Sequence, residues 1–277
     1  MTKLTIGTTV YDDYDGLYFT IQSIRLNNPE ILNRIEFVII NNNPSSASGK
    51  EIRKILDWIE EPVTYLEFSK YNTPFLKGRV FDLADTEYVL VLDCHVLLDP
   101  GCLTKLLNFY DQKKDEGNLL QGPLIYDNLA GIATHYDLSK WGSHMWGVWA
   151  TDKRGLDKNA EPFEIPAQGM GLFSCRKSSW LGFNKALRGF GGEEGYIHEK
   201  YRNYGRKTLC LPFLRWLHRF GRPNGATFKP NIKDKFRNYM IGFRETGKDT
   251  AEVIEQFKGV ISKEYIQTVE QELLQIT

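Results

Sequence analysis

The chain has 277 residues, enough for one large domain or a domain with an appendage, and 42% are hydrophobic, which allows a sizeable core. Its 35 basic and 35 acidic residues cancel, so the net charge selects no class of partner. No segment has the roughly 18 uninterrupted apolar residues of a membrane span, and the N-terminus lacks the apolar stretch of a secretion signal. The four cysteines form no CxxC pair, which favours reduced thiols. We therefore expect a cytoplasmic protein.

Strands and helices alternate in the first part of the chain. Short apolar runs predict strands at residues 4–10, 35–40, 63–68 and 88–92. Apolar residues at helical spacing predict helices after the first two strands; Thr73-Pro74 opens a third helix, and Pro100 opens a fourth that runs to Tyr110. This order, with short connections, predicts an α/β fold whose mostly parallel sheet is flanked by helices on both faces.

The second part is less regular. We expect strands at 119–125, 169–174 and 208–212 and a helix at 194–203. Residues 126–165 show no periodicity, so we expect a functional loop or lid there. Beyond Pro230 the pattern is helical, with Thr250 and Ser262 as N-cap candidates. We accordingly divide the chain into a main domain, residues 1–232, and a helical C-terminal extension, residues 233–277.

The strand at 88–92 ends in Asp93-Cys94-His95. Open α/β sheets bind their ligands at the carboxyl ends of strands. Residues two apart on a strand face the same side, so Asp93 and His95 can bind one ion while Cys94 faces away. One oxygen and one nitrogen ligand suit Mn²⁺ or a similar divalent ion. A strand end capped by polar residues is the alternative.

Two further groups carry candidate chemistry. Glu193 and Glu194 follow Gly191-Gly192, and adjacent carboxylates at a helix start can orient hydroxyl groups or act as a base. A turn followed by acidic residues that favour a first helical turn explains this pattern better on its own. His218 stands among aromatic residues, and spacing alone gives no reason to join it to Asp93.

Positive charge is concentrated in one segment. Residues 201–237 hold ten lysines and arginines against one acid, Asp234, a local charge of +9. Such a segment attracts a nucleotide diphosphate or a nucleic-acid backbone. A solvated basic face is the alternative.

Four segments together resemble a GT-A glycosyltransferase of family 2 and its polypeptide N-acetylgalactosaminyltransferase-like branch. They are residues 169–174, 180–183, 190–194 and 218–221, and the resemblance runs from about residue 4 to residue 223. In that branch the metal motif is Asp-x-His, which Asp93-Cys94-His95 matches, and a later histidine, here His218, completes the metal site. The resemblance implies a UDP-sugar donor whose diphosphate is bridged by Mn²⁺ or Mg²⁺.

The resemblance also implies which residues hold the donor. Residues at the end of the first strand hold uracil and ribose, and Asn41-Asn42 stand where members commonly have Asp-Asp. Asn42 can still accept a hydrogen bond from the base through its amide oxygen. Gly78-Arg79 match a Gly-x-x-Arg-like donor segment loosely. The implied donor-binding residues are Thr8, Thr9, Val10, Asn41, Asn42, Gly78, Arg79 and Asp93.

Glu193 and Glu194 fill the catalytic position of the resemblance. Inverting members carry Glu-Asp, with the Asp as general base, whereas retaining polypeptide transferases carry Gly-Gly-Glu-Asn and no dedicated base. Glu194 stands at the position that distinguishes the two branches. Both stereochemical outcomes stay open.

Residues 191–200 and 211–220 look like small GT-A proteins of phages and bacteria, some of which are associated with sugar addition to hydroxymethylated pyrimidines in DNA. The expected function is metal-dependent sugar transfer from a UDP-sugar to a hydroxyl acceptor, with such DNA as one candidate acceptor, in the cytoplasm of the host if the protein is phage-encoded. The base would be flipped out, and aromatic residues of 126–165 could stack on it. The alternatives are a protein or glycan acceptor, and an inactive GT-A domain that binds nucleic acid.

Overall fold

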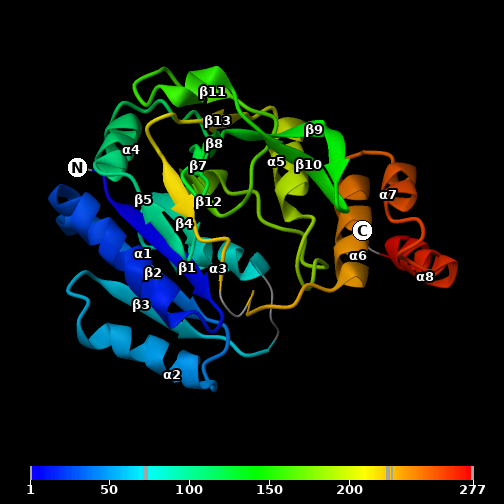
Figure 1. The fold of residues 1–277 in the computed structure, drawn as a ribbon, viewed down its shortest axis with the longest axis horizontal. Coiled ribbons are helices and arrows are strands. Elements are labelled where there is room, and N and C mark those ends of the chain that lie inside the picture. The colour runs from blue at the N-terminus through cyan, green and yellow to red at the C-terminus, as the bar shows by residue number, and fades with distance from the viewer. Residues whose placement is uncertain (1, 71–73, 223–224, 226, 276–277) are drawn as a thin grey trace.

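A computed structural model describes residues 2–70, 74–222, 225 and 227–275. Its central layer is an eight-stranded sheet with the order β11-β13-β6-β12-β4-β1-β2-β3 (Figure 1). The parallel part contains four strands: β1 (Leu4–Val10), β2 (Ile35–Asn41), β3 (Val63–Glu67) and β4 (Tyr88–Asp93). The other part contains four strands: β6 (Leu119–Gln121), β11 (Phe163–Glu164), β12 (Leu172–Arg176) and β13 (Thr208–Cys210). The predicted mostly parallel α/β sheet is confirmed.

The parallel strands bring their carboxyl ends to one edge. Strand β1 lies between β2 and β4, with Val10 opposite Asn41 and Thr9 opposite Asp93. The first five residues of β4 are all buried because helices cover both faces of the sheet. Polar residues begin where this cover ends, so the carboxyl edge of β1, β2 and β4 is where side chains become available to a ligand.

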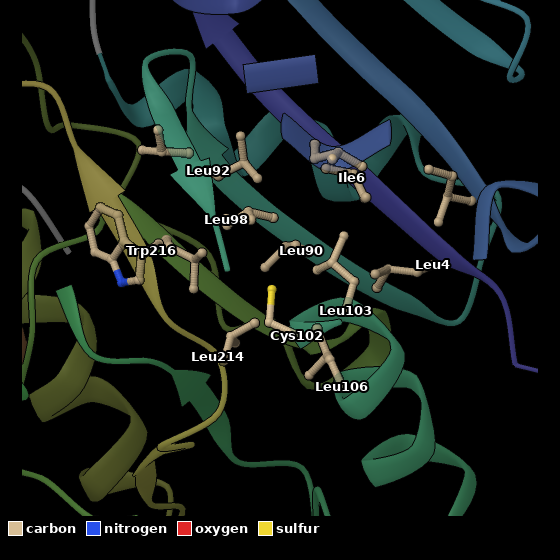
Figure 2. Close-up of a cluster of buried hydrophobic side chains, with 14 of the residues drawn as sticks. Leu4, Ile6, Leu90, Leu92, Leu98, Cys102, Leu103, Leu106, Leu214 and Trp216 are labelled. Atoms are coloured by element: carbon tan, nitrogen blue, oxygen red, sulfur yellow. The ribbon is translucent and has the colours of Figure 1, made fainter. Parts of the chain in front are cut away.

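One face of the sheet is covered by N-terminal helices: α1 (Tyr14–Asn27), η1 (Pro29–Arg34), α2 (Ala47–Arg53), η2 (Lys54–Asp57) and α4 (Cys102–Asp111). In the core on this side, Leu90 of β4 faces Leu103 of α4, with Leu214 and Trp216 closing one end (Figure 2). Full burial of such a side chain contributes about 1.5–3 kcal/mol. The helix predicted after the second strand changes at Lys54 into the 3-10 turn η2, and α4 begins at Cys102 rather than at Pro100.

The other face is covered by α3 (Lys77–Leu83), α5 (Glu193–Asn203) and α6 (Ile232–Glu245). Helices α7 (Thr250–Gln256) and α8 (Lys263–Leu273) follow, at the end of the molecule opposite to α1 and α2 (Figure 1). The 3-10 turn η3 (Pro74–Leu76) precedes α3, and the predicted N-cap Thr73 lies outside the described residues. Helix α6 is buried from Phe236 to Phe243 because it shares one core with the sheet and α5.

The helix caps confirm one C-terminal prediction and correct another. Ser262 caps α8 by accepting a hydrogen bond from the Tyr265 backbone N–H at 3.3 Å. Helix α7 is capped by Asp249 instead of Thr250, because the Asp249 carboxylate accepts from the Ala251 backbone N–H. None of the helices in the described ranges combines the length and hydropathy that a membrane crossing requires.

The expectation of an irregular loop at 126–165 is wrong. The segment forms β8 (Ile132–Ala133), a hairpin of β9 (His135–Gly142) and β10 (Met145–Ala150), and the 3-10 turn η4 (Lys153–Leu156), before β11. The two hairpin turn residues, Ser143 and His144, have φ values of 49° and 59°, which a tight hairpin turn requires. Ser-His lacks the Asn-Gly pattern that normally signals such a turn, so the sequence did not reveal it.

A small second sheet carries part of the candidate site. Its order is β5-β14-β7-β8, with β5 (Val96–Leu98), β7 (Leu124–Ile125) and β14 (Trp216–His218). The predicted strand at 119–125 is split into β6 and β7 at Gly122, where a Cβ atom would lie 1.7 Å from the Leu214 carbonyl oxygen. Strand β14 pairs antiparallel with β5, and His218 lies opposite Val96.

Candidate active site

Asp93, His95 and His218 converge at the carboxyl end of β4. Strand β4 ends at Asp93, and Cys94 and His95 form a turn into β5. The pairing of β14 with β5 then brings His218 next to that turn. The two Nε2 atoms of His95 and His218 are 3.1 Å apart, and His218 Nε2 lies 3.4 Å from Asp93 Oδ2. A turn, rather than the alternation of one strand, brings the three side chains together.

Two neighbours of the His95 ring determine which nitrogen faces the cluster. Asp13 Oδ2 lies 3.1 Å from Nδ1, and the Arg222 guanidinium lies 2.7 Å from Nε2. Because arginine can only donate hydrogen bonds, Nε2 is the acceptor and the proton sits on Nδ1, facing Asp13. The Nε2 lone pair is the one a metal ion uses when a carboxylate holds the other nitrogen.

Asp13 is itself fixed at the start of α1. Its carboxylate accepts from the Gly16 backbone N–H at 3.1 Å and from Arg219 at 2.7 Å. Burial tends to raise the pKa of Asp13, but His95 and Arg219 outweigh burial and lower the pKa to about 2. The carboxylate therefore stays ionised beside His95.

Lys77, at the start of α3, holds Asp93. Its ammonium lies 2.6 Å from Asp93 Oδ1 and donates to the Met170 carbonyl oxygen at 2.8 Å. Burial works against the charge of Asp93, but Lys77 and then His218 and His95 hold the pKa of this carboxyl well below its usual range. Asp93 Oδ2 stays directed at His218.

The chemistry of this cluster fits a divalent metal ion. One ligand atom from each of Asp93, His95 and His218 lies within 4.8 Å of the other two. One ionised carboxylate with two imidazole nitrogens suits Mn²⁺ or a similar ion. A second group of potential ligands, Asp13, Cys94 and His95, is unsuitable because burial holds the pKa of the Cys94 thiol far above its usual range.

A cavity of about 260 Å³ opens beside the cluster. Its wall joins the carboxyl ends of β1, β2 and β4 to the segment that follows β14. There Thr227 donates to the Tyr11 carbonyl oxygen at 2.9 Å, and the Phe228 ring lies 5.9 Å from the ring of Tyr11. The cavity is lined by Thr9, Val10, Tyr11, Asp13, Asn42, Asp93, His95, Phe190, His218, Arg222, Thr227, Phe228 and Pro230.

The predicted donor-binding residues fall into two groups. Thr9, Val10, Asn42 and Asp93 line the cavity. The other four lie elsewhere: Thr8 is buried within β1, Asn41 donates to Gly49 and Tyr65, and Gly78 and Arg79 line a separate hollow of about 800 Å³ beside residues 180–189.

Glu193 and Glu194 are the first two residues of α5. The turn before them requires glycine, because Gly191 and Gly192 have φ values of 97° and 93°. Burial raises the pKa of both glutamates, and the charge of Glu194 raises that of Glu193 further. The positive charges of Lys77 and Lys235 oppose this effect. Lys77 thus acts on both the acid pair and Asp93.

The basic segment at 201–237 does not form one basic face. Four of its charges are paired with acids elsewhere in the chain: Arg202 with Glu199, Lys207 with Glu164, Arg219 with Asp13 and Arg237 with Glu272. Arg222 and Lys235 face the candidate site. Most of the segment therefore serves internal contacts and the site.

The sequence interpretation missed Asp13, Lys77, Lys235 and Asn238. Asp13 lies in a polar loop that follows the first strand, and Lys77 directly precedes the expected Gly78. No local pattern marks Lys235, whose charge acts on the acid pair, or Asn238, which donates to Gly191 in the turn before that pair. Both lie in the part of the chain expected to be a helical C-terminal extension.

The parallel sheet, the cavity at its carboxyl edge and the Asp-x-His motif joined by a distant histidine define a GT-A glycosyltransferase fold. The chain belongs to glycosyl transferase family 2, whose sequence profile matches residues 5–179. No curated protein matches the chain.

Solved structures share the fold at low sequence identity. GalNAc-T7, solved with UDP, GalNAc and Mn²⁺, is 16% identical with a TM-score of 0.67, and the match covers 99% of this chain and 54% of that chain. This protein thus spans about half the length of the GalNAc-T7 chain. TarS 1-349 of S. aureus is 12% identical with a TM-score of 0.57, covering 98% and 82% of the two chains. The same TarS fragment solved with UDP-GlcNAc has a TM-score of 0.57 at 12% identity, covering 92% and 70%.

Proposed function

We propose that this protein transfers a sugar from a UDP-sugar to a hydroxyl acceptor, with a divalent metal ion held by Asp93, His95 and His218. The convergence of these three side chains beside the cavity carries the proposal. Membership of glycosyl transferase family 2 supports the reaction class. A UDP-sugar donor is supported by GalNAc-T7, solved with UDP, GalNAc and Mn²⁺, and by TarS, solved with UDP-GlcNAc.

The donor nucleotide would lie in the cavity at the carboxyl ends of β1 and β2. Asn42 donates from Nδ2 to the Phe68 carbonyl oxygen at 2.9 Å, which fixes the amide so that its other atom is an acceptor oxygen. An acceptor at this place favours a base with a ring N–H, such as uracil. Arg222 lies on the same cavity and would bind the diphosphate, because a guanidinium matches phosphate oxygens.

A metal ion at Asp93, His95 and His218 would neutralise the charge that develops on the leaving diphosphate. The chain's own residues prepare that position: Lys77 keeps Asp93 ionised, and Asp13 keeps the His95 proton on Nδ1, so that the Nε2 lone pair, which accepts from Arg222 here, could pass to a metal ion. Arg222 adds positive charge on the same side. The leaving group would therefore meet a site already arranged for negative charge.

Glu194 is our candidate base, with Glu193 orienting the acceptor or the sugar. A base must be ionised to accept the acceptor's hydroxyl proton, and a raised pKa brings its working range towards neutral pH. If Glu194 is the base, the product has the inverted anomeric configuration. If the protein follows the retaining branch, Glu194 orients the substrate and replacing it by Gln has a smaller effect.

For the acceptor we propose a hydroxymethylated pyrimidine in DNA. Its support is the sequence resemblance of residues 191–200 and 211–220, together with exposed Lys229 next to the segment that covers the cavity. Two of the aromatics expected to stack on a flipped base are otherwise engaged: Trp141 donates to Glu252 at 2.7 Å, and Trp146 is buried against Phe243. A protein or glycan hydroxyl is the second candidate, because the acid pair requires only a hydroxyl group.

Donor hydrolysis tests the reaction without knowledge of the acceptor. With Mn²⁺ present, we expect slow release of UDP from one UDP-sugar in a panel and a complete stop on addition of EDTA. A protein that binds duplex DNA yet releases no UDP from any donor, with or without acceptors, would instead be an inactive nucleic-acid-binding domain.

An acceptor panel read by mass spectrometry identifies the substrate. The panel contains duplex DNA with 5-hydroxymethylpyrimidines, a Ser/Thr peptide and free glycans, each with the active donor. A mass gain of one sugar on the DNA supports the DNA proposal. A gain only on the peptide or glycan contradicts it.

A further inference from the structure

We propose that helix α6 is a positioning element of the active site, in which Asn238 holds the turn at 188–192 that aims Glu193 and Glu194. The proposal rests on the function proposed above for the acid pair. It assigns a task to a C-terminal helix that contains none of the predicted site residues.

Asn238 uses both ends of its amide on this one turn. Its Oδ1 accepts from the Arg188 backbone N–H at 3.1 Å, and its Nδ2 donates to the carbonyl oxygens of Arg188 at 2.7 Å and Gly191 at 2.9 Å. The side chain is completely buried, so water cannot replace these bonds. An aspartate of the same size could accept but not donate.

The turn also packs directly on α6. A Cβ atom at Gly191 would lie 2.9 Å from Lys235 Cγ, and one at Gly192 would lie 3.2 Å from Asn238 Cβ. Positive φ values at Gly189, Gly191 and Gly192 fit the chain to this surface. The helix and the turn are therefore complementary at two levels, in backbone shape and in hydrogen bonds.

The position of the turn fixes the positions of the Glu193 and Glu194 carboxylates, because no linker lies between them. Gly192 is the N-cap of α5, so Glu193 and Glu194 follow it immediately as the first helical residues. Lys235, one turn before Asn238 on α6, contributes the opposing positive charge. A displacement of about 1 Å at a catalytic group can reduce the rate on the order of 10²-fold.

The experiment compares Asn238→Asp and Asn238→Ala with Asn203→Ala. Asn203 also donates its amide to a backbone carbonyl of the α6 end, that of Thr246 at 2.9 Å, but it lies at the far end of α5 from the acid pair. For both Asn238 variants we expect kcat to fall on the order of 10²-fold, with the Mn²⁺ affinity changed less than about 2-fold, because the hydrogen bonds of Asn238 go to Arg188 and Gly191 and not to Asp93, His95 or His218. When it is assayed well below its melting temperature, the Asn203→Ala variant should have the wild-type kcat.

Hydrogen exchange separates this proposal from the proposed function. In the wild type, the Arg188 amide should exchange slowly, and both Asn238 variants should accelerate exchange across residues 188–194 more than Asn203→Ala does. An unprotected Arg188 amide in the wild type, or an unchanged kcat in the folded Asn238 variants, would overturn the proposal. If the wild type transfers no sugar, the proposed function fails, and exchange at Arg188 still decides whether α6 holds the turn.

Discussion

The two groups of titratable side chains in this site differ in how their charges are balanced. Asp93 has Lys77 at 2.6 Å, and Asp13 has Arg219 at 2.7 Å and His95 at 3.1 Å. The acid pair of Glu193 and Glu194 is placed instead by the backbone at the start of α5, where the charges of Lys77 and Lys235 oppose the effect of burial on its pKa values.

The pKa directions follow from this difference. Paired carboxylates in the first group have pKa values below their usual range, about 2 for Asp13, whereas burial raises the pKa of both members of the acid pair. Above about pH 4 the first group keeps its charge, whereas the acid pair changes protonation at a pH above the usual range of a glutamate. One half of the site is built to stay charged, and the other to exchange a proton.

Removing His218 should have the largest effect, because it removes one ligand from the cluster that stays charged. Loss of several kcal/mol of charge stabilisation corresponds to a rate decrease of about 10³-fold or more. We expect His218→Ala to lose Mn²⁺-dependent UDP release. His144→Asn is the matched control, because His144 lies in the β9–β10 turn and Asn tolerates its φ of 59°. Near-normal activity of His218→Ala would remove His218 from the site.

Asp13→Asn should weaken Mn²⁺ binding about 10–100-fold, because the carboxylate that orients His95 is lost. Titration of Mn²⁺ followed by electron paramagnetic resonance measures this without turnover. Asp12→Asn is the control, since Asp12 accepts from Asn43 at 2.8 Å rather than facing His95. Equal affinities for the two variants would show that Asp13 does not orient the ligand.

Lys235→Met should shift the pH dependence of kcat/KM. Removing the ammonium raises the pKa of the acid pair further, so the acid limb of the pH–rate profile moves to higher pH. Lys77 and Asp93, which also act on the pKa of Glu194, are unchanged in this variant. Methionine keeps much of the apolar stem that packs on Gly191. The control is Lys233→Met, whose ammonium lies over the Tyr265 ring. If the acid limb of the pH–rate profile stays in place or moves to lower pH, the role assigned to Lys235 is contradicted.

Trp141→Phe should have the smallest effect. It removes the hydrogen bond from the indole N–H to Glu252, at a cost of about 0.5–1.5 kcal/mol in the free energy of unfolding. Because this contact joins the hairpin to α7 and not to the acid pair, we expect an unchanged kcat. Thermal melts and initial rates measure the two quantities. A large loss of kcat would mean that the hairpin, and not only α6, positions the site.

The sequence predicted the half of the molecule in which the local pattern of apolar residues agrees with their burial in the fold. Strands buried on both faces are continuous apolar runs, so β1, β2 and β4 were found close to their true bounds, and Asp93-Cys94-His95 stood out at the end of β4. Family resemblance joined His218 to that motif. The physical reason, the pairing of β14 with β5, was visible only in the structure.

The other half depends on contacts between distant segments. The β9–β10 hairpin carries no turn signal, and two of its aromatics, Trp141 and Trp146, pack on α6 and on Phe257 at the end of α7. Asn238 and Gly191 are 47 positions apart, so their hydrogen bond leaves no periodicity to detect. Asn41 and Asn42 are adjacent, yet only the second lines the cavity, because successive residues at a strand end face opposite sides.

Diffraction data at the manganese absorption edge, from crystals of this protein grown with Mn²⁺ and UDP, test the central claim most directly. The account predicts one anomalous peak bound by Asp93, His95 and His218, with UDP in the cavity beside Asn42. A peak bound by other residues, or UDP held in the cavity with no metal near this cluster, would contradict it.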